Sequence, residues 1–383
     1  MKPLTWGSAI LAAAALMCAL PGCAPSETGW QGKIESRDGV TVVHNPRAPL
    51  HPEPVLELEE VLSIQGSETE EEQMFQDIRT LDVDSEGNIY ILDEGAADIK
   101  VFNGAGKHVR TIGRQGQGPG EFAFPIMVLV TPQAELLVHD MNQRALKILD
   151  FEGNFLRQIS IADMFQFTGP RFMPGGRMVG SHLVPAQEPL AELKLFDGEL
   201  EPLLTIVSLP VEPPPVLHYF AGNSMTGLRW NLNNRGVVVW GDFLESEYAL
   251  HVHDAQGNLL RTIEREYDVI RITEADKEPL LRKMFGDNPP PPQWDIRIPD
   301  RYPPFSGLSC DDSGRIYVKT YTLDGQEVGE AYDIFDAEGR YMAQVTLPVP
   351  LMVMRNDFLY TIVDNVNGFR EVKRFRMNWL QEF

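Results

Sequence analysis

The sequence is poor in three features that would each point to a particular class of protein. Three cysteines among 383 residues are too few for a disulfide framework. Lys and Arg number 33 against 55 Asp and Glu, a net charge of −22, so the chain lacks the basic surplus that binds nucleic acid. After residue 23, no stretch reaches the about 18 consecutive apolar residues of a membrane-spanning helix. These shortages exclude a disulfide-stapled domain and argue against both a nucleic-acid-binding protein and a helical membrane protein.

What the chain has instead is enough apolar material for a large core. Hydrophobic residues make up 43% of it, so it is not a disordered chain. Its 32 glycines and 29 prolines suit a fold with many tight turns. The length allows two ordinary domains or one large all-β domain.

The first 23 residues have the pattern of a secretion signal. Lys2 precedes an unbroken apolar run from Ile10 to Leu20, which is too short to span a membrane. The run ends in Leu-Pro-Gly-Cys23, which resembles a bacterial lipobox, the motif in which the cysteine is lipidated. We therefore expect residues 1–22 to be a lipoprotein signal peptide, Cys23 to carry the lipid and residues 23–29 to form a tether. The alternative is an ordinary secretory signal with an incidental cysteine.

This signal predicts a location in the cell envelope, lipid-anchored outside the cytoplasmic membrane. Ala24, at the second position of the mature chain, is not the aspartate that is associated with retention in the inner membrane. In a Gram-negative host, the pattern therefore favours the outer membrane and the periplasm.

One unit recurs along the body of the chain. It consists of a turn with glycine, an apolar strand, a polar loop, a second strand and a hairpin turn of the form Asp/Asn-x-x-Gly. Asp93 and Asp140 occupy the same place in successive units and are 47 residues apart, as are Gly106 and Gly153. Repeats of about 40–50 residues with four short strands are typical of β-propeller blades, which bury their two apolar faces by stacking around a ring.

Six such units predict an all-β fold, a six-bladed β-propeller of four-stranded blades within residues 55–383. The last unit shows only three strands. Residues 55–64 alternate apolar and polar side chains ahead of the first unit, so we expect this N-terminal strand to complete the last blade and close the ring. The expected blades cover residues 76–113, 124–161, 167–208, 223–265, 304–347 and 348–378.

Two stretches in the first repeats carry a family resemblance. Gly113-Arg-Gln-Gly-Gln-Gly-Pro-Gly-Glu-Phe122, followed by Pro125, is similar to the NHL-repeat signature, together with Gly87-Asn-Ile-Tyr-Ile-Leu-Asp93 upstream. From about residue 30 to 380, the chain resembles the bacterial six-bladed β-propeller lipoproteins of that group. The resemblance implies the fold. It says little about function, because propellers host binding proteins, lyases, lactonases and scaffolds alike.

Two segments stand outside the blade count. Residues 30–54 hold an expected extra hairpin on the outside of the ring. Residues 266–303 form an expected insertion between blades four and five, with a short helix from Glu274 to Phe285 after Thr273 and then four prolines in a row. This insertion and the other long loops fall at junctions that share one face of a propeller. They are rich in Pro, Tyr, Trp and Phe, which are suited to contacts, so we expect function on that face.

Three patterns that imitate ligand sites have simpler explanations. The glycine-rich stretch 113–120 lacks the Gly-Lys-Ser/Thr ending of a phosphate loop. Residues 82–93 carry acidic side chains in the order of a calcium loop, but strands flank them where that loop needs helices. The eight histidines are scattered singly, without metal-binding spacing. The sequence therefore predicts no cofactor and names no catalytic residue. The amidating lyases hold zinc with histidines from different blades, and such a site has no recognisable spacing in the sequence. A zinc or calcium ion in the central channel therefore remains an open alternative.

The expected inner strands carry arginines, which is notable in so acidic a chain. Arg79, Arg171 and Arg229, with Trp230 after the last, are the candidate binding residues, because cations at a channel mouth attract a carboxylate or a phosphate. The competing interpretation is that each arginine pairs with a nearby carboxylate such as Asp77.

The favoured function is a binding or scaffold module, expected to be a monomer. The sequence leans against an enzyme but does not decide the question. Its partner would be an unidentified protein, a peptide or a small anionic ligand, with no nucleic acid and with the membrane contacted through the lipid only. The alternative is a metal-dependent lyase or hydrolase with its site at the central channel.

Overall fold

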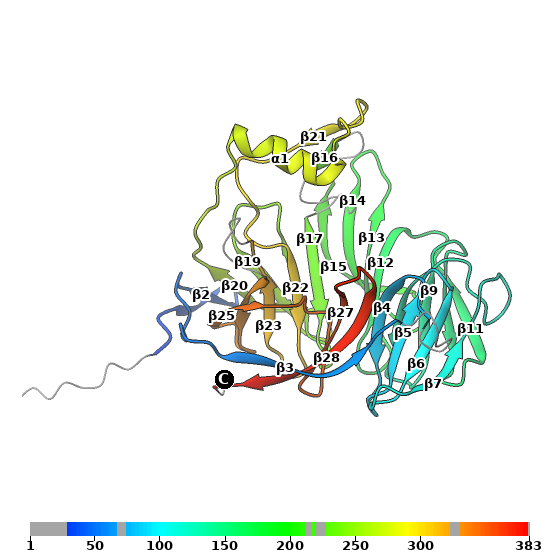
Figure 1. The fold of residues 1–383 in the computed structure, drawn as a ribbon. Coiled ribbons are helices and arrows are strands. Elements are labelled where there is room, and N and C mark those ends of the chain that lie inside the picture. Colours follow the sequence, from blue (N-terminus) through cyan, green and yellow to red (C-terminus); the bar gives the residue numbers. More distant parts are fainter. Residues whose placement is uncertain (1–28, 67–73, 212–215, 219–226, 322–328, 382–383) are drawn as a thin grey trace, which may run out of the picture.

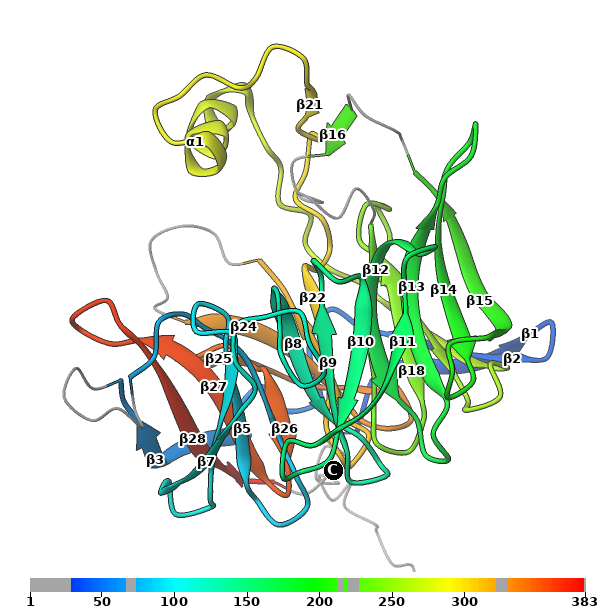
Figure 2. The same ribbon diagram turned by 90° about the vertical axis from the view of Figure 1, so that its right-hand side faces the viewer.

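The computed structural model describes residues 29–66, 74–211, 216–218, 227–321 and 329–381. These residues form strands almost throughout, with a single α-helix among them, α1 (Glu274–Phe285). Six sheets are arranged around one axis (Figures 1 and 2). Each is built on four antiparallel strands that follow one another in the chain, except that β3 is the fourth strand of the last blade, beside β28, and that β2 and β1 extend the blade that ends in β20. The prediction of an all-β, six-bladed β-propeller is confirmed.

The first three blades follow the chain in simple order, each from its inner strand to its outer strand. Blade one consists of β4 (Ile78–Val83), β5 (Ile89–Asp93), β6 (Asp98–Phe102) and β7 (His108–Ile112). Blade two consists of β8 (Pro125–Val130), β9 (Leu136–Asp140), β10 (Ala145–Leu149) and β11 (Phe155–Ser160). Blade three consists of β12 (Phe165–Phe172), β13 (Met178–Val184), β14 (Leu190–Phe196) and β15 (Pro202–Pro210).

Of the last three blades, blades four and six recruit strands from the N-terminal part of the chain. Blade four consists of β17 (Leu228–Leu232), β18 (Val238–Asp242), β19 (Ala249–His253) and β20 (Leu259–Arg265), extended outward by β2 (Val40–Asn45) and β1 (Lys33–Arg37). Blade five consists of β22 (Gly307–Cys310), β23 (Ile316–Lys319), β24 (Glu330–Phe335) and β25 (Tyr341–Leu347). Blade six consists of β26 (Val353–Arg355), β27 (Phe358–Asp364), β28 (Arg370–Trp379) and β3 (Leu56–Ile64).

The closing strand β3 is held by main-chain and side-chain contacts along its length. It pairs antiparallel with β28, from Ile64 opposite Val372 to Leu56 opposite Trp379. Lys373 Nζ also lies 2.9 Å from Glu60 Oε2. The alternation of side chains in this strand puts Leu56 and Ile64 in the interior, which fixes the pairing register. The prediction that residues 55–64 complete the last blade is therefore confirmed.

We call residues 29–64 the N-terminal belt, because they follow the outer edges of three successive blades (Figure 1). The hairpin β1–β2 adds to blade four, with β2 running parallel to β20. The amides of Leu50 and His51 then donate to the carbonyls of Tyr341 and Met342 on blade five, at 3.1 and 2.8 Å. The chain next enters blade six as β3. The belt thus links blades four, five and six from outside.

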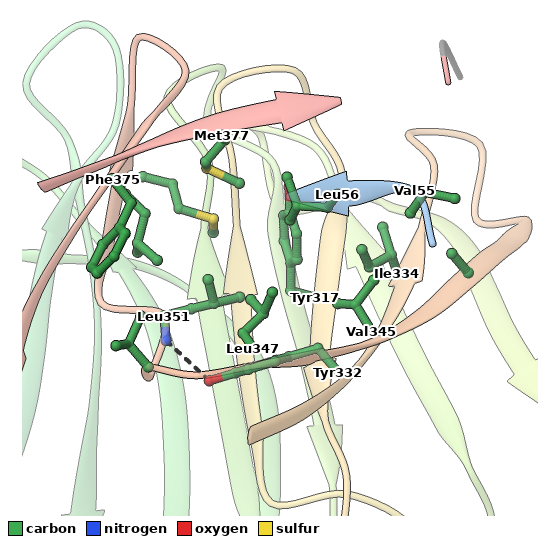
Figure 3. Close-up of a cluster of buried hydrophobic side chains, with 14 residues drawn as sticks. Val55, Leu56, Tyr317, Tyr332, Ile334, Val345, Leu347, Leu351, Phe375 and Met377 are labelled. Carbon is green, nitrogen blue, oxygen red and sulfur yellow. Dashed lines mark hydrogen bonds between the residues drawn. The ribbon is translucent and has the colours of Figure 1, made fainter. Parts of the chain in front are cut away.

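The hydrophobic core is divided into six main clusters, one between each pair of adjacent blades. Figure 3 shows the cluster between blades five and six, where Leu56 of the closing strand packs with Tyr317, Tyr332 and Phe375. The Tyr332 hydroxyl accepts a hydrogen bond from the amide of Leu351 at 3.0 Å, which satisfies both polar groups inside this cluster. Each fully buried side chain of this size contributes about 1.5–3 kcal/mol, so every blade depends on both of its neighbours.

The antiparallel order gives the ring two unlike faces. The turns after each first and third strand lie on one face, which we call the short-turn face. The turns after each second strand and the connections between blades lie on the other, which we call the long-loop face. The insertion carries α1 and β21 (Asp295–Arg297), and β21 pairs in parallel with β16 (Val216–His218). All three stand above the long-loop face in both views of the ribbon (Figures 1 and 2).

Candidate functional site

A cleft on the long-loop face has a volume of about 890 Å³. One wall is the connection between β18 and β19, from Phe243 to Ser246. The insertion supplies the other walls, through Lys277 and Leu281 of α1 and through the segment that runs from Pro290 to Pro303. The cleft is larger than the hollows of about 590, 500 and 400 Å³ found elsewhere on the described surface, and its volume falls in the usual range for ligand sites.

The insertion is held above the ring by a short antiparallel stem. The amide of Ile272 donates to the carbonyl of Asp300 at 2.9 Å, and the amide of Tyr302 donates to the carbonyl of Ile270 at 2.9 Å. Beyond the stem, the helix begins where predicted, because the Asp276 carboxylate accepts hydrogen bonds from the amide and hydroxyl of Thr273 at 2.7 Å. The Tyr267 hydroxyl donates to the carbonyl of Ser246 at 2.8 Å and ties the base of the insertion to the opposite wall.

The lining of the cleft combines apolar side chains with charged groups at its edges. Trp294, Ile298 and Tyr302 are half-buried and line the insertion side, facing Phe243 on the propeller side. At the edges, Lys277 pairs with Glu274 at 2.6 Å, and Arg301 with Asp300 at 3.2 Å.

One acidic group of the cleft is perturbed by its surroundings. Burial raises the pKa of Glu245, and the neighbouring Asp242 and Glu247 carboxylates add to the effect. Aromatic and aliphatic walls with polar groups at the edge suit a ligand that is apolar along part of its length and polar elsewhere.

Arg229 and Trp230 lie in β17 and are not among the residues that line this cleft, and both are occupied by protein partners. Arg229 donates from Nε to the carbonyl of Ser306 at 3.1 Å and from Nη1 to that of Leu228 at 3.1 Å. Its guanidinium stacks 4.2 Å from the centre of the Phe243 ring. Trp230 Nε1 donates to Ser181 Oγ at 3.2 Å. Arg229 therefore joins blades four and five and supports the cleft wall from below.

The other two arginines lie apart from that pair. Arg79 is exposed and forms an ion pair with Glu94 at 3.2 Å, while Asp77 pairs with Arg370. Arg171 comes two residues before the turn that starts at Met173, so it lies toward the short-turn face. The expectation that the arginines gather at one mouth is wrong for Arg171, because side chains at different distances from the turn reach different ends of an inner strand. Cys23 lies outside the described residues.

The glycine-rich stretch 113–120 is a structural junction between blades one and two. The amide of Phe122 donates to the carbonyl of Arg114 at 2.9 Å, and the amide of Gly118 donates to the Glu121 carboxylate at 2.9 Å. Lys147, fully buried, donates to the carbonyl of Gly118 at 3.3 Å and to that of Glu121. Several polar groups of the loop are therefore bonded to other groups of the protein, which agrees with the interpretation of this stretch as a turn between blades.

Asp84 and Asp93, two of the carboxylates in the calcium-like stretch 82–93, also serve their own turns. The Asp84 carboxylate accepts hydrogen bonds from the amides of Glu86 and Asn88 and from the Tyr90 hydroxyl. Asp93 accepts from the amides of Gln76 and Asp77. In the part of the chain that the structure describes, no three His, Cys, Asp or Glu side chains are grouped so that they could hold a metal ion. The described residues also include no helix that is both long enough and apolar enough to cross a bilayer.

The aromatic walls of the cleft, Trp294, Tyr302 and Phe243, were not singled out individually by the sequence. The available signal was their position in proline-rich segments that interrupt the blade period. That signal predicts that the long-loop face carries the site. It does not predict that the insertion packs opposite residues 243–246, because this depends on tertiary contacts.

Comparisons with known proteins agree with this architecture. Residues 55–173 match a family model described as a 6-bladed beta-propeller. Over 84 residues, 22% of this chain, the sequence is 26% identical to the E3 ubiquitin-protein ligase NHLRC1 of Homo sapiens. The chain spans only 20% of the length of that ligase, so this match concerns the repeat and not the whole ligase.

Two solved bacterial structures share the fold over most of their length. One is a Bacteroides fragilis protein described as exported, with a TM-score of 0.53 and 10% identity over 88% of this chain and 99% of the other. The second is a member of the duf4221 family from Bacteroides vulgatus, with a TM-score of 0.54 and 13% identity over 85% of this chain and 99% of the other. At such identities the likeness shows the fold alone. The resemblance to bacterial six-bladed β-propellers with NHL-like repeats is thereby confirmed.

Proposed function

We propose that this protein is a binding module of the cell envelope that captures a segment of a partner protein in the cleft on its long-loop face. The observation that carries the proposal is the insertion 266–303. It contributes no strand to any blade, yet it is folded into walls of the cleft. Ordering a segment costs about 1–2 kcal/mol per residue in backbone entropy. Because the insertion is not needed to close the ring, its ordered structure favours a role in binding.

The surface around the cleft favours a protein over a small molecule as the partner. Large apolar side chains are exposed at other connections of the same face, at Phe124, Met141 and Phe369, which are 36%, 55% and 56% exposed, and at the base of the insertion, at Val269, which is 46% exposed. Apolar anchors spread over a face with a cleft at one side fit an interface in which one buried segment is surrounded by weaker contacts. A small ligand would leave these side chains uncovered.

The proposed location is outside the cytoplasmic membrane, with a lipid on Cys23. The signal-like segment 1–23 supports it, as does the fold shared with a bacterial protein described as exported. Fatty-acid labelling of the wild type and of Cys23→Ser in a bacterial host tests the anchor. Labelling that persists in the variant would contradict it.

Site-specific photo-crosslinking in the native envelope tests the binding function. A photoreactive residue at Trp294 should give a crosslinked protein that mass spectrometry identifies. The matched control is Leu259, which is 37% exposed next to a turn of the short-turn face. Excess wild-type protein should compete for the partner. A variant with a short Gly-Ser linker in place of residues 274–297 should not compete.

Purified partner should then bind the wild type, and Trp294→Ala should weaken binding at least about tenfold, as expected for an aromatic anchor in a cleft. Equal crosslinking from Leu259, or unchanged binding by the linker variant, would contradict the proposal. One equivalent of zinc or calcium in the purified protein, lost together with ligand binding, would instead favour a metal-dependent lyase or hydrolase.

A further inference from the structure

Arg171 stands near the ring axis, and none of the described residues pairs with its side chain. It is the penultimate residue of β12, the inner strand of blade three. No hydrogen bond or ion pair to Arg171 is found among the described residues, although a guanidinium carries five N–H donors. Its side chain has ample accessible surface, yet the surrounding protein is dense enough that desolvation lowers the pKa of Arg171. Both properties follow if the side chain projects into the water-accessible centre of the ring.

The electrostatic neighbours of Arg171 come from three other blades. They are Asp82 of blade one, Cys310 of blade five and Arg355 of blade six. All four residues lie at the ends of inner strands that lead into the short-turn face, one or two positions before the turn. Because these strands surround one axis, residues at the same level face one another across it.

Asp82 is the single carboxylate of this group, and backbone amides donate hydrogen bonds to both of its oxygens. Asp82 Oδ1 accepts a hydrogen bond from the amide of Val83 at 2.8 Å, and Oδ2 accepts from the amide of Val130 at 2.7 Å. Arg355 donates from Nη1 to the carbonyl of Val83 at 2.5 Å, and its Nη2 is 3.9 Å from Asp82 Oδ1, beyond hydrogen-bonding distance.

The charges of the group leave an excess of positive potential. Two guanidinium groups face one carboxylate, and the Cys310 thiol adds no charge because burial raises its pKa to about 12. Arg171 keeps all of its donors for water or a ligand.

We propose that Arg171 and Arg355 form a binding site for a small oxyanion, a carboxylate or a phosphate, on the ring axis near the short-turn face. A guanidinium fork matches two oxygens of such a group, and the surrounding protein strengthens the attraction relative to bulk water. In a chain with a net charge of −22, a local surplus of two arginines over one aspartate would attract anions that the acidic surface repels. It lies at the opposite end of the ring from the cleft and does not depend on it.

Isothermal titration calorimetry at low ionic strength with sodium phosphate and with sodium acetate, in a chloride background, tests the site. At least one of the two should bind the wild type with one site per chain, and the stronger binder shows whether phosphate or carboxylate is preferred. Arg171→Gln should weaken binding at least about tenfold. The affinity of Arg171→Lys should lie between those of the wild type and Arg171→Gln, because lysine keeps the charge but lacks the two-pronged guanidinium. Arg79→Gln is the matched control, since Arg79 is exposed and already paired with Glu94. The linker variant lacking residues 274–297 should bind the anion as the wild type does.

A second measurement separates ligand binding from a structural role. In chloride alone, Arg171→Gln should melt at the wild-type temperature or above it, because the substitution removes an unpaired, desolvated cation beside Arg355. A melting temperature lowered by several degrees would show that Arg171 stabilises the fold and would overturn the proposal. So would the failure of both anions to bind the wild type, or equal binding by Arg171→Gln.

Discussion

The two faces of the ring differ in how their longest connections are held. On the short-turn face, most turns are closed by the side chain of their first residue. The Asp311 carboxylate, for example, accepts from the amides of Ser313 and Arg315 at 3.0 and 2.9 Å. On the long-loop face, the insertion is held by a stem and by contacts with distant segments such as the 243–246 wall. Repeated, self-contained turns therefore carry the fold, and the segments that break the repeat carry the surface that distinguishes this propeller.

The largest effect should come from removing the closing strand. Deleting residues 55–64 leaves β28 without its outer partner and exposes the cluster of Figure 3, so cooperative unfolding should be lost. Urea denaturation followed by circular dichroism, with size-exclusion chromatography, measures this. The linker variant that lacks residues 274–297 removes more residues but should keep a cooperative transition near the wild-type midpoint. If both deletions had the same effect, the division between scaffold and cleft would be wrong.

A pair of aspartates compares the two faces directly. Asp311→Ala on the short-turn face removes the acceptor of the buried Tyr317 hydroxyl and the ion-pair partner of Arg315 at 3.1 Å, which should cost about 3 kcal/mol of unfolding free energy. Asp300→Ala at the cleft loses only an exposed pair with Arg301 and should change stability by about 0.5 kcal/mol or less. Chemical denaturation of both variants measures the difference. Similar losses would remove the contrast between the faces.

The dependence of stability on pH should arise in the blades. Burial, with a smaller contribution from His253, lowers the pKa of His251 to about 4, where the ring stacks 4.2 Å from Trp240. Above pH 6.5, His251 is neutral in both the folded and the unfolded state. Between 6.5 and about 4, the unfolded chain binds a proton that the folded chain does not, so stability falls as the pH falls.

The loss from this one histidine should reach at most about 3 kcal/mol. Denaturation midpoints at several pH values test it, and His251→Gln should flatten the curve over that window. An unchanged curve would show that other groups set the acid sensitivity.

The smallest effect on stability should follow from substitutions at exposed apolar positions of the long-loop face. Phe369→Ser removes a side chain that is 56% exposed, so the melting temperature should stay within about 1–2 °C of the wild type. The same substitution should weaken capture of the partner protein, measured with the purified pair. A clear loss of stability would place Phe369 in the scaffold.

The blades could be predicted because their information is local and repeated. The Asp-x-x-Gly turns, the alternating strand 55–64 and the helix start at Thr273 are all readable from a few neighbouring residues. The site was only partly predictable. Arg229 lies four residues before Asn233, the first residue of its turn, and Arg171 lies two before Met173, so counting back from the turn would have placed them at different levels of the ring.

The partners of these residues had no such signal in the sequence. Arg355 contacts Val83 across 272 positions of the chain, and Leu50 pairs with Tyr341 on another blade. Contacts of this kind are set by the closure of the ring and leave no pattern within a single repeat.

The N-terminal belt has a consequence for the order in which the molecule folds. Glu60 of β3 pairs with Lys373 of β28 across 313 positions of the chain, so a strand that is synthesised early has no partner until the last strand has been made. Such a long loop must close before its contacts stabilise anything, which slows folding and keeps the nascent chain open. Blades one to three can form early, but a complete ring cannot exist until the C-terminal strand is free. A chain that passes through a membrane before it folds benefits from this delay, because the topology itself postpones the compact state until the whole polypeptide has arrived.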